Sequence, residues 1–235
     1  STRIARRSVL LRAVETALPP GERLGTIVDV GCGAGSQAIY LAGLYDRYIG
    51  VDQSQAMVDI ASRLTEKMPN VEFVCANFKD ANIAPGSVDT VLFAHVLHHM
   101  TDIETVFDAA RRAAKPGGRL IAIEPQRGNP LIQGLRWIRT KIDASYSPDQ
   151  HFFERSELQA IMDNSNLADI RLVYQSFLTQ PFATVILNPQ AVFHPLSRVA
   201  VAIEPMIEKL LVGPMARLSW LLTATATFPD DGGKT

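Results

Sequence analysis

One stretch, from Gly25 to Asp52, constrains the fold of this chain more than any other. It reads GTIVDVGCGAGSQAIYLAGLYDRYIGVD. Thr26 to Val30 is short, apolar and rich in β-branched residues, which predicts a buried strand. Glycines then interrupt it, and the pattern continues as a helix from Ser36 to Leu44 and a second strand from Tyr48 to Val51. Strand, glycine turn, helix and strand in this order are typical of an open parallel sheet.

The same stretch predicts a nucleoside site. Glycines let a ligand approach the backbone closely, and the N–H groups at the start of the following helix face the same space. Asp52 comes at the end of the second strand, where a carboxylate can accept two hydrogen bonds from a ribose diol. Ser36 stands where the dinucleotide pattern G-x-G-x-x-G has its third glycine. A site for NAD and a glycine turn without a ligand are the alternatives.

Length, charge and cysteine content limit the class of protein. A chain of 235 residues can bury the core of one large α/β domain. The net charge of −1 gives no bulk attraction to nucleic acid, so no nucleic-acid partner is expected. The two cysteines, Cys32 and Cys75, argue against a disulfide framework and favour the cytoplasm. No secretory signal is expected, because the apolar run of the arginine-rich N-terminus is too short.

Alternating helices and strands are expected along the rest of the chain. Helices are predicted at 2–18, 55–67, 105–114, 131–141, 154–164 and 197–211, and strands at 71–75, 88–94, 119–124, 167–177 and 219–228. Ser54 is the expected N-cap of the second of these helices, and Met57 and Ile60 are expected to face the sheet. The arginines of the first helix are interpreted as a solvated face, or as a cover that places an arginine near a carboxylate.

The segment from Leu172 to Ser197 contains no charged residue. Prolines interrupt it, so it predicts a strand followed by an apolar lid and not a transmembrane segment. Peripheral contact with a membrane is the minor alternative.

Three histidines, His95, His98 and His99, follow the fourth predicted strand. His95 and His99 could share a helix face, but no glutamate follows His95 as in H-E-x-x-H and no third ligand is evident. No metal site is therefore predicted.

Several segments resemble, in order and spacing, the motifs of class I S-adenosylmethionine-dependent methyltransferases. These are VDVGCGAG, VDQS, CANF, VDTVLFAHVLHHM and AAKPGGRLIAIEP, between Gly25 and Pro125. They are most similar to those of the small-molecule enzymes that include the ubiquinone and menaquinone biosynthesis group. The resemblance implies a Rossmann-like three-layer sandwich with a seven-stranded sheet of order 3-2-1-4-5-7-6, in which strand 7 is antiparallel. It also implies a single domain over 1–235, with an N-terminal helix within 1–20 and acceptor-side insertions at 126–153 and 181–215.

The resemblance also assigns the cofactor-binding residues. Asp29 would lie near the methionyl amino group, Gly31, Gly33 and Gly35 along its path, Asp52 at the ribose, Gln53 beside the adenine, Asn77 and Phe78 at the base, and Phe93 would offer its carbonyl to the amino group. Relatives often carry Asp where Asn77 stands, but an amide can still bond the adenine edge. The implied cofactor is S-adenosyl-L-methionine, with S-adenosyl-L-homocysteine as the product.

The expected reaction transfers a methyl group to a small, hydrophobic metabolite or natural-product intermediate. A general base helps where the acceptor is a hydroxyl, and His95 or His98 is favoured for that role, with His151 next. The fourth strand ends in F-A-H-V and not in an N-P-P-Y-like segment, which favours O- or C-methylation. The alternatives are non-methyl chemistry with the same cofactor and a non-catalytic binding subunit. The acceptor and the oligomeric state do not follow from the sequence.

Overall fold

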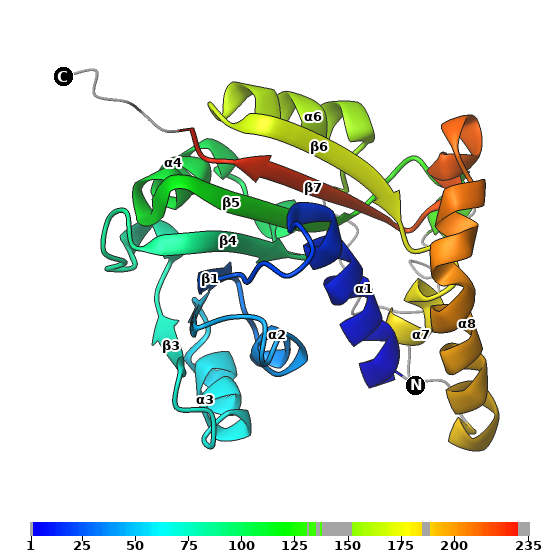
Figure 1. Ribbon diagram of the computed structural model, residues 1–235, viewed down its shortest axis with the longest axis horizontal. Helices are drawn as coiled ribbons and strands as arrows, with labels where there is room; N and C mark the ends of the chain where they lie inside the picture. Colours follow the sequence, from blue (N-terminus) through cyan, green and yellow to red (C-terminus); the bar gives the residue numbers. More distant parts are fainter. Residues whose placement is uncertain (1, 131, 135–136, 138–151, 185–188, 230–235) are drawn as a thin grey trace.

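The computed structural model of this protein describes residues 2–130, 132–134, 137, 152–184 and 189–229. Seven strands form one sheet in the order β3-β2-β1-β4-β5-β7-β6 (Figure 1). Their bounds are β1 (Thr26–Val30), β2 (Arg47–Asp52), β3 (Val71–Cys75), β4 (Val88–Ala94), β5 (Ala114–Pro125), β6 (Ala168–Gln175) and β7 (Leu221–Thr227). The first five pair in parallel, and β7 runs antiparallel between β5 and β6. The predicted strand order and the single antiparallel strand are confirmed.

Helices cover both faces of this sheet. They are α1 (Thr2–Ala17), α2 (Ser36–Tyr40), α3 (Gln55–Leu64), α4 (Ile103–Ala113), α6 (Arg155–Asn164), α7 (Gln180–Thr184) and α8 (Gln190–Leu210), with short 3₁₀ helices η1 (Phe78–Asp80), η2 (Leu97–His99) and η3 (Gly213–Leu218). One core cluster joins the sheet to α4 and α6, and a second joins its other face to α1 and α2. Side chains along β1 point alternately to the two faces of the sheet, so Val28 packs in the first cluster and Ile27 packs in the second. The result is the predicted three-layer α/β sandwich.

The orientation of α3 differs from the prediction. Ser54 caps the helix as expected and accepts a hydrogen bond from Met57 N. Met57 and Ile60, however, are 40% and 36% exposed, whereas Val58 and Ala61 are buried. The predicted buried face of α3 was wrong because the larger side chains were assigned to the sheet. The small Ala61 instead allows α3 to approach the glycine loop closely.

The segment 115–118 does not form the tight turn between helix and strand that its Lys-Pro-Gly-Gly sequence predicts. It belongs to β5, where the register against β4 shifts between Val88 and Thr90. Gly117 adopts a positive φ of 71° and its N–H bonds to Phe228 O at 2.9 Å, so β5 absorbs the irregularity while staying in the sheet. Most of the predicted helix at 131–141 lies outside the described residues. Within the described segments, no helix has both the length and the hydropathy to cross a bilayer.

Helices from the two ends of the chain lie side by side at the carboxyl edge of the central strands (Figure 1). The Nε of Arg6 on α1 donates to Ala183 O of α7 at 2.7 Å, and Arg12 forms an ion pair with Glu208 of α8. The Gln175 amide donates to Val9 O at 2.7 Å, which ties the end of β6 to α1. These contacts place α1 and α7 over one end of the sheet.

Candidate functional site

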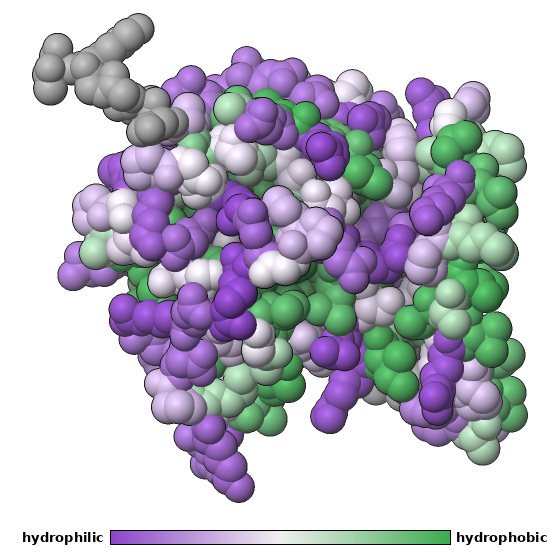
Figure 2. All heavy atoms as spheres, in the orientation of Figure 1, coloured by the Kyte–Doolittle hydropathy of each residue, from purple (hydrophilic) through white to green (hydrophobic). Residues whose placement is uncertain are grey.

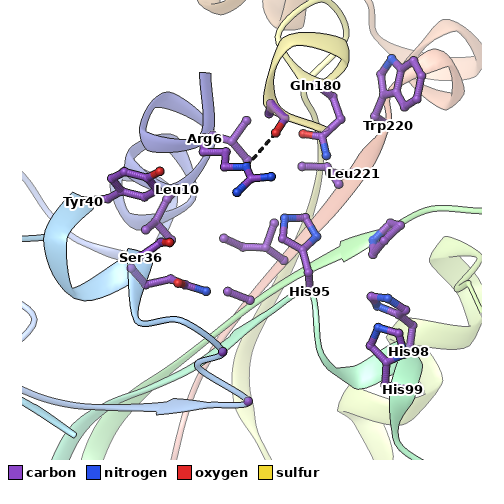
Figure 3. A pocket seen from close by; sticks show the side chains of 18 of the residues that line it. Arg6, Leu10, Ser36, Tyr40, His95, His98, His99, Gln180, Trp220 and Leu221 are labelled. Carbon is purple, nitrogen blue, oxygen red and sulfur yellow. Dashed lines mark hydrogen bonds between the residues drawn. The ribbon is translucent and has the colours of Figure 1, made fainter. Parts of the chain in front are cut away.

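A cavity of about 820 Å³ opens at the carboxyl edge of β1, β4 and β5, beneath α1 and α7 (Figure 3). Ligands of open α/β sheets bind at this edge, and the volume suits a nucleoside-sized ligand with room beside it. Its lining is mostly apolar and includes Val9, Leu10, Ala94, Ile123, Pro125, Ile132, Phe152, Pro181, Trp220 and Leu221. Its polar groups come from the glycine loop, from α2, from Arg6, from Gln180 and from three histidines.

The glycine loop forms the floor of the cavity near β1. Gly31 has a φ of 68°, and a Cβ there would lie 2.3 Å from Val96 Cγ2, so no larger residue fits without a shift. Gly33 also has a positive φ, of 51°, but a Cβ added there would meet nothing within 4 Å. The loop therefore packs tightly against the start of the β4–α4 connection at one glycine and presents bare backbone at the other.

Asp52, at the end of β2, is half-buried and bonded to this loop. Its Oδ2 accepts from Gly33 N at 2.8 Å, and its Oδ1 accepts from Ser54 N at 2.9 Å. A carboxylate offers about four acceptor positions, so two stay available for a diol. Gln53, next to it, is exposed.

Asp29 is fully buried at the end of β1. Its Oδ2 accepts a hydrogen bond from the Tyr48 hydroxyl, while its Oδ1 has no hydrogen-bond partner among the described residues. Burial raises the pKa of Asp29 to about 7, the Tyr48 bond opposes this shift, and the charge of Asp52 adds to it. An unpaired buried carboxylate oxygen is costly, and a cationic ligand group would relieve that cost.

The residues predicted to contact the base lie outside the cavity lining. Asn77 caps η1, because its Oδ1 accepts from Lys79 N at 3.3 Å. Phe78 is 5% exposed and belongs to the core cluster under α4. Phe93 is fully buried and stacks on Phe107, with ring centroids 5.5 Å apart, so its side chain serves the core.

Glu124, fully buried at the end of β5, organises the connection that carries the histidines. Its Oε1 accepts from Val96 N at 3.0 Å and Leu97 N at 2.8 Å, and its Oε2 lies 2.6 Å from His98 Nδ1. A carboxylate at this distance fixes the proton of His98 on Nδ1. His98 is thereby held in place, and its ring stacks on Phe152.

His95 is the histidine that reaches furthest toward the middle of the cavity, facing Arg6 on α1 (Figure 3). Its φ of 60° is a strained conformation for a residue other than glycine, and its N–H donates to Ile123 O at 2.8 Å. His95 is exposed to the cavity rather than buried in the core. Desolvation by the protein that encloses the cavity lowers its pKa, the charges of His98 and Arg6 lower it further, and Glu124 opposes them. The imidazole is therefore neutral near pH 7 and can accept a proton.

The structure thus divides the predicted site residues into two groups. Gly31, Gly33, His95 and His98 line the cavity. The other predicted residues among those described lie outside its lining: Asp29, Gly35, Phe78 and Phe93, and, at or after the ends of β2 and β3, Asp52, Gln53 and Asn77. His151 lies outside the described residues. The sequence analysis missed Glu124, although an acid that ends an otherwise apolar strand (LIAIEP) is a signal of a buried, bonded carboxylate. Among the described residues, no group of His, Cys, Asp and Glu could hold a metal ion.

The sequence of the sheet's first half matches a known family. Residues 28–122 match a family model described as a methyltransferase domain. The O-methyltransferase cnsE of Penicillium expansum is 34% identical over 127 residues, which are 52% of this chain and 45% of that protein. The ubiquinone biosynthesis O-methyltransferase of Thiobacillus denitrificans is 34% identical over 110 residues, 46% of this chain and 47% of that protein. The chain therefore spans less than half the length of these curated relatives.

Solved structures share the whole fold at low identity. A methyltransferase from Thermotoga maritima, described as a possible histamine N-methyltransferase, superposes with a TM-score of 0.65 at 19% identity over 97% of this chain and 91% of its own. The geranyl diphosphate C-methyltransferase of Streptomyces coelicolor, crystallised with S-adenosyl-L-homocysteine, superposes with a TM-score of 0.62 at 16% identity, over 95% of this chain and 77% of its own.

Proposed function

We propose that this chain is a class I S-adenosylmethionine-dependent methyltransferase and that it transfers a methyl group to a small, apolar acceptor held in the cavity beside His95. The observation that carries the proposal is the placement of this apolar cavity between the glycine loop and the two histidines. O- or C-methylation is the proposed outcome, and curated relatives named as O-methyltransferases support it.

The glycine loop that lines the cavity and the polar residues next to this loop fit the cofactor. The bare backbone at Gly33 leaves room for a ligand, and the unpaired Oδ1 of Asp29 suits an ammonium group. Asp52 would hold the ribose hydroxyls, with Gln53 and Asn77 along the adenine at the open edge. When bound, S-adenosylmethionine supplies a sulfonium methyl group, which is a strong electrophile without further activation.

The remaining work of the protein is to align the acceptor, exclude water and accept a proton. The apolar walls and the cover formed by α1 and α7 exclude water and orient the acceptor. His95 would accept the proton of a hydroxyl acceptor, since desolvation inside the cavity lowers its pKa and favours the neutral imidazole. His98, bonded to the buried Glu124, is assigned as a positioning residue that fixes the connection carrying His95.

Calorimetric titration with S-adenosylmethionine and S-adenosylhomocysteine tests the cofactor assignment. Asp52→Ala should weaken binding by about 1.5–3 kcal/mol, because it removes charge-assisted hydrogen bonds. Asp59→Ala, on the exposed part of α3, is the matched control and should bind normally. Unchanged affinity in a folded Asp52→Ala variant would contradict the site.

Release of S-adenosylhomocysteine in the presence of a panel of apolar phenols and enols tests the reaction. His95→Gln should lower kcat by about 10²–10⁴-fold for a hydroxyl acceptor while cofactor binding is kept. A His95→Gln variant with full kcat would refute the role of His95. Cofactor binding without methyl transfer to any acceptor, or turnover to a product other than a methylated one, would favour a binding subunit or non-methyl chemistry.

A further inference from the structure

Helix α8 presents an apolar stripe to the outside of the molecule. Its members recur every three or four residues, which places them on one helix face. They are Val192, Leu196, Val199, Ile203, Met206 and Leu210, and they are 37–64% exposed. Val212, Met215 and Leu218, in and beside η3, extend the stripe and are 44–65% exposed. Figure 2 shows hydrophobic residues gathered along α8 at the edge of the molecule. We refer to these nine residues as the α8 stripe.

The inner side of α8 is anchored to the rest of the fold by two carboxylates. Glu204 is 1% exposed, and its carboxylate accepts from the N–H groups of Phe177, Leu178 and Thr179 at 2.6–3.0 Å. Glu208 accepts from Ser176 N at 2.9 Å. Helix α8 thus departs from the usual surface helix, because most of its large apolar side chains face outward while a carboxylate is buried on its inner side. Since bonds to buried carboxylates fix this orientation, the outward position of the stripe is a built feature of the fold.

The exposed charged residues on the segment that carries the stripe all have one sign. Among residues 189–218, the exposed charged residues are Arg198, Lys209 and Arg217, while both acids, Glu204 and Glu208, are bonded to protein groups. This cationic excess stands on a chain whose net charge is −1. A second copy of α8 would bring only cations to these cations. An anionic lipid surface, in contrast, complements both the apolar side chains and the positive charges.

We propose that the α8 stripe docks the protein on an anionic lipid bilayer, with its apolar side chains in the boundary between headgroups and acyl chains. The stripe is close to the cavity, because Glu204 bonds the backbone that leads into α7, and Pro181 and Ala183 of α7 line the cavity. The inference rests on the proposed function in one respect: an apolar acceptor dissolved in the bilayer would reach the cavity from this side.

Co-sedimentation with vesicles tests the docking. The full chain is mixed with vesicles of phosphatidylcholine alone or of phosphatidylcholine with phosphatidylglycerol, at low and high salt. Binding is expected to the anionic vesicles, to be stronger there than to the neutral ones, and to weaken with salt. The double variant Val199→Asp, Met206→Asp should lose at least about tenfold in affinity, because two apolar contacts are replaced by anions. Ile60→Asp with Leu64→Asp, on the exposed side of α3, is the matched control and should bind like the parent.

A charge-only variant guards against a folding defect. Arg198→Gln with Lys209→Gln should reduce binding to anionic vesicles about fivefold per residue and leave thermal unfolding unchanged. Failure of the parent chain to bind either vesicle would overturn the docking, as would equal binding to both. The docking would also be overturned if light scattering showed that the parent is a dimer and that the Val199→Asp, Met206→Asp variant is a monomer. S-adenosylmethionine titration separates the two proposals: if it binds while vesicles do not, only the docking fails.

Discussion

The two sides of the cavity are built in different ways. The loop side, which consists of Gly31–Gly35 and Asp52, is held by bonds between neighbouring strands that lie close in sequence. The cover, which consists of α1 and α7, is held by bonds between opposite ends of the chain, Arg6 to Ala183 and Gln175 to Val9. The side proposed to bind the cofactor is thus built on the central strands of the sheet, whereas the side proposed to bind the acceptor is assembled from segments added around it. Acceptor preference can change in such a fold without disturbing the cofactor site.

The largest effect is expected on the loop side. Gly31→Ala combines a positive φ with a Cβ 2.3 Å from Val96 Cγ2, and should lower the free energy of unfolding by about 2–5 kcal/mol. Gly33→Ala imposes the same strain of a positive φ but no contact within 4 Å of the added Cβ, and should lower the free energy of unfolding by about 1–2 kcal/mol. Denaturant titration of both variants measures the difference. Equal losses would show that the contact with the β4–α4 connection does not hold the loop.

The next effect is expected on the cover. Glu204→Gln keeps the shape of the side chain but removes the charge that three N–H groups share, and should cost about 1.5–3 kcal/mol of unfolding free energy. Because the cover forms the acceptor side, the KM for the acceptor should rise while the Kd for S-adenosylmethionine stays unchanged. Glu66→Gln, at an exposed position, is the control. A parallel loss of cofactor affinity would break the distinction between the two sides.

Asp29 should make the contribution of the loop side to folding stability depend on pH. Its pKa is raised to about 7 in the folded protein, against about 4 for an unfolded chain, so the folded state holds an extra proton between these values. Its contribution to stability is therefore complete below about pH 4 and is lost as the pH rises to about 7. Unfolding experiments on the parent and on Asp29→Asn should give a difference in stability that changes in this direction. A difference that is constant with pH would refute the raised pKa.

His95 gives a smaller effect of the opposite sign. Desolvation inside the cavity lowers its pKa below the ordinary value of about 6.5, so just below that pH the unfolded chain binds a proton that the folded protein does not. The contribution of His95 is present above about pH 6.5 and is lost as the pH falls. Comparison of the parent with His95→Gln at about pH 5 and about pH 7.5 isolates it. The kcat of the parent should keep its full value down to a pH below 6.5.

The sequence predicted the loop side well because its determinants are local. Alternating apolar strands, the glycines and the acid that ends β2 lie within one short stretch, and the strand bounds of β1, β3 and β4 agree with the structure. The phase of α3 was wrong because two small or branched residues, and not the largest ones, pack against the sheet. The bonds of Glu124 to the β4–α4 connection and the Arg6–Ala183 bond were missed because the partners are distant in sequence. Only the burial of Glu124 has a local signal, the acid that ends an apolar strand.

A single carboxylate joins the outside of this molecule to the roof of its cavity. Glu204 stands on the helix that carries the outward apolar residues, and it grips the three amides just before α7. If α8 moved alone, those amides would be stranded without water or partner, at a cost of about 1–3 kcal/mol each. We therefore expect α8 and α7 to move together, so that a force on the outer face of α8 reaches the proposed acceptor side of the cavity.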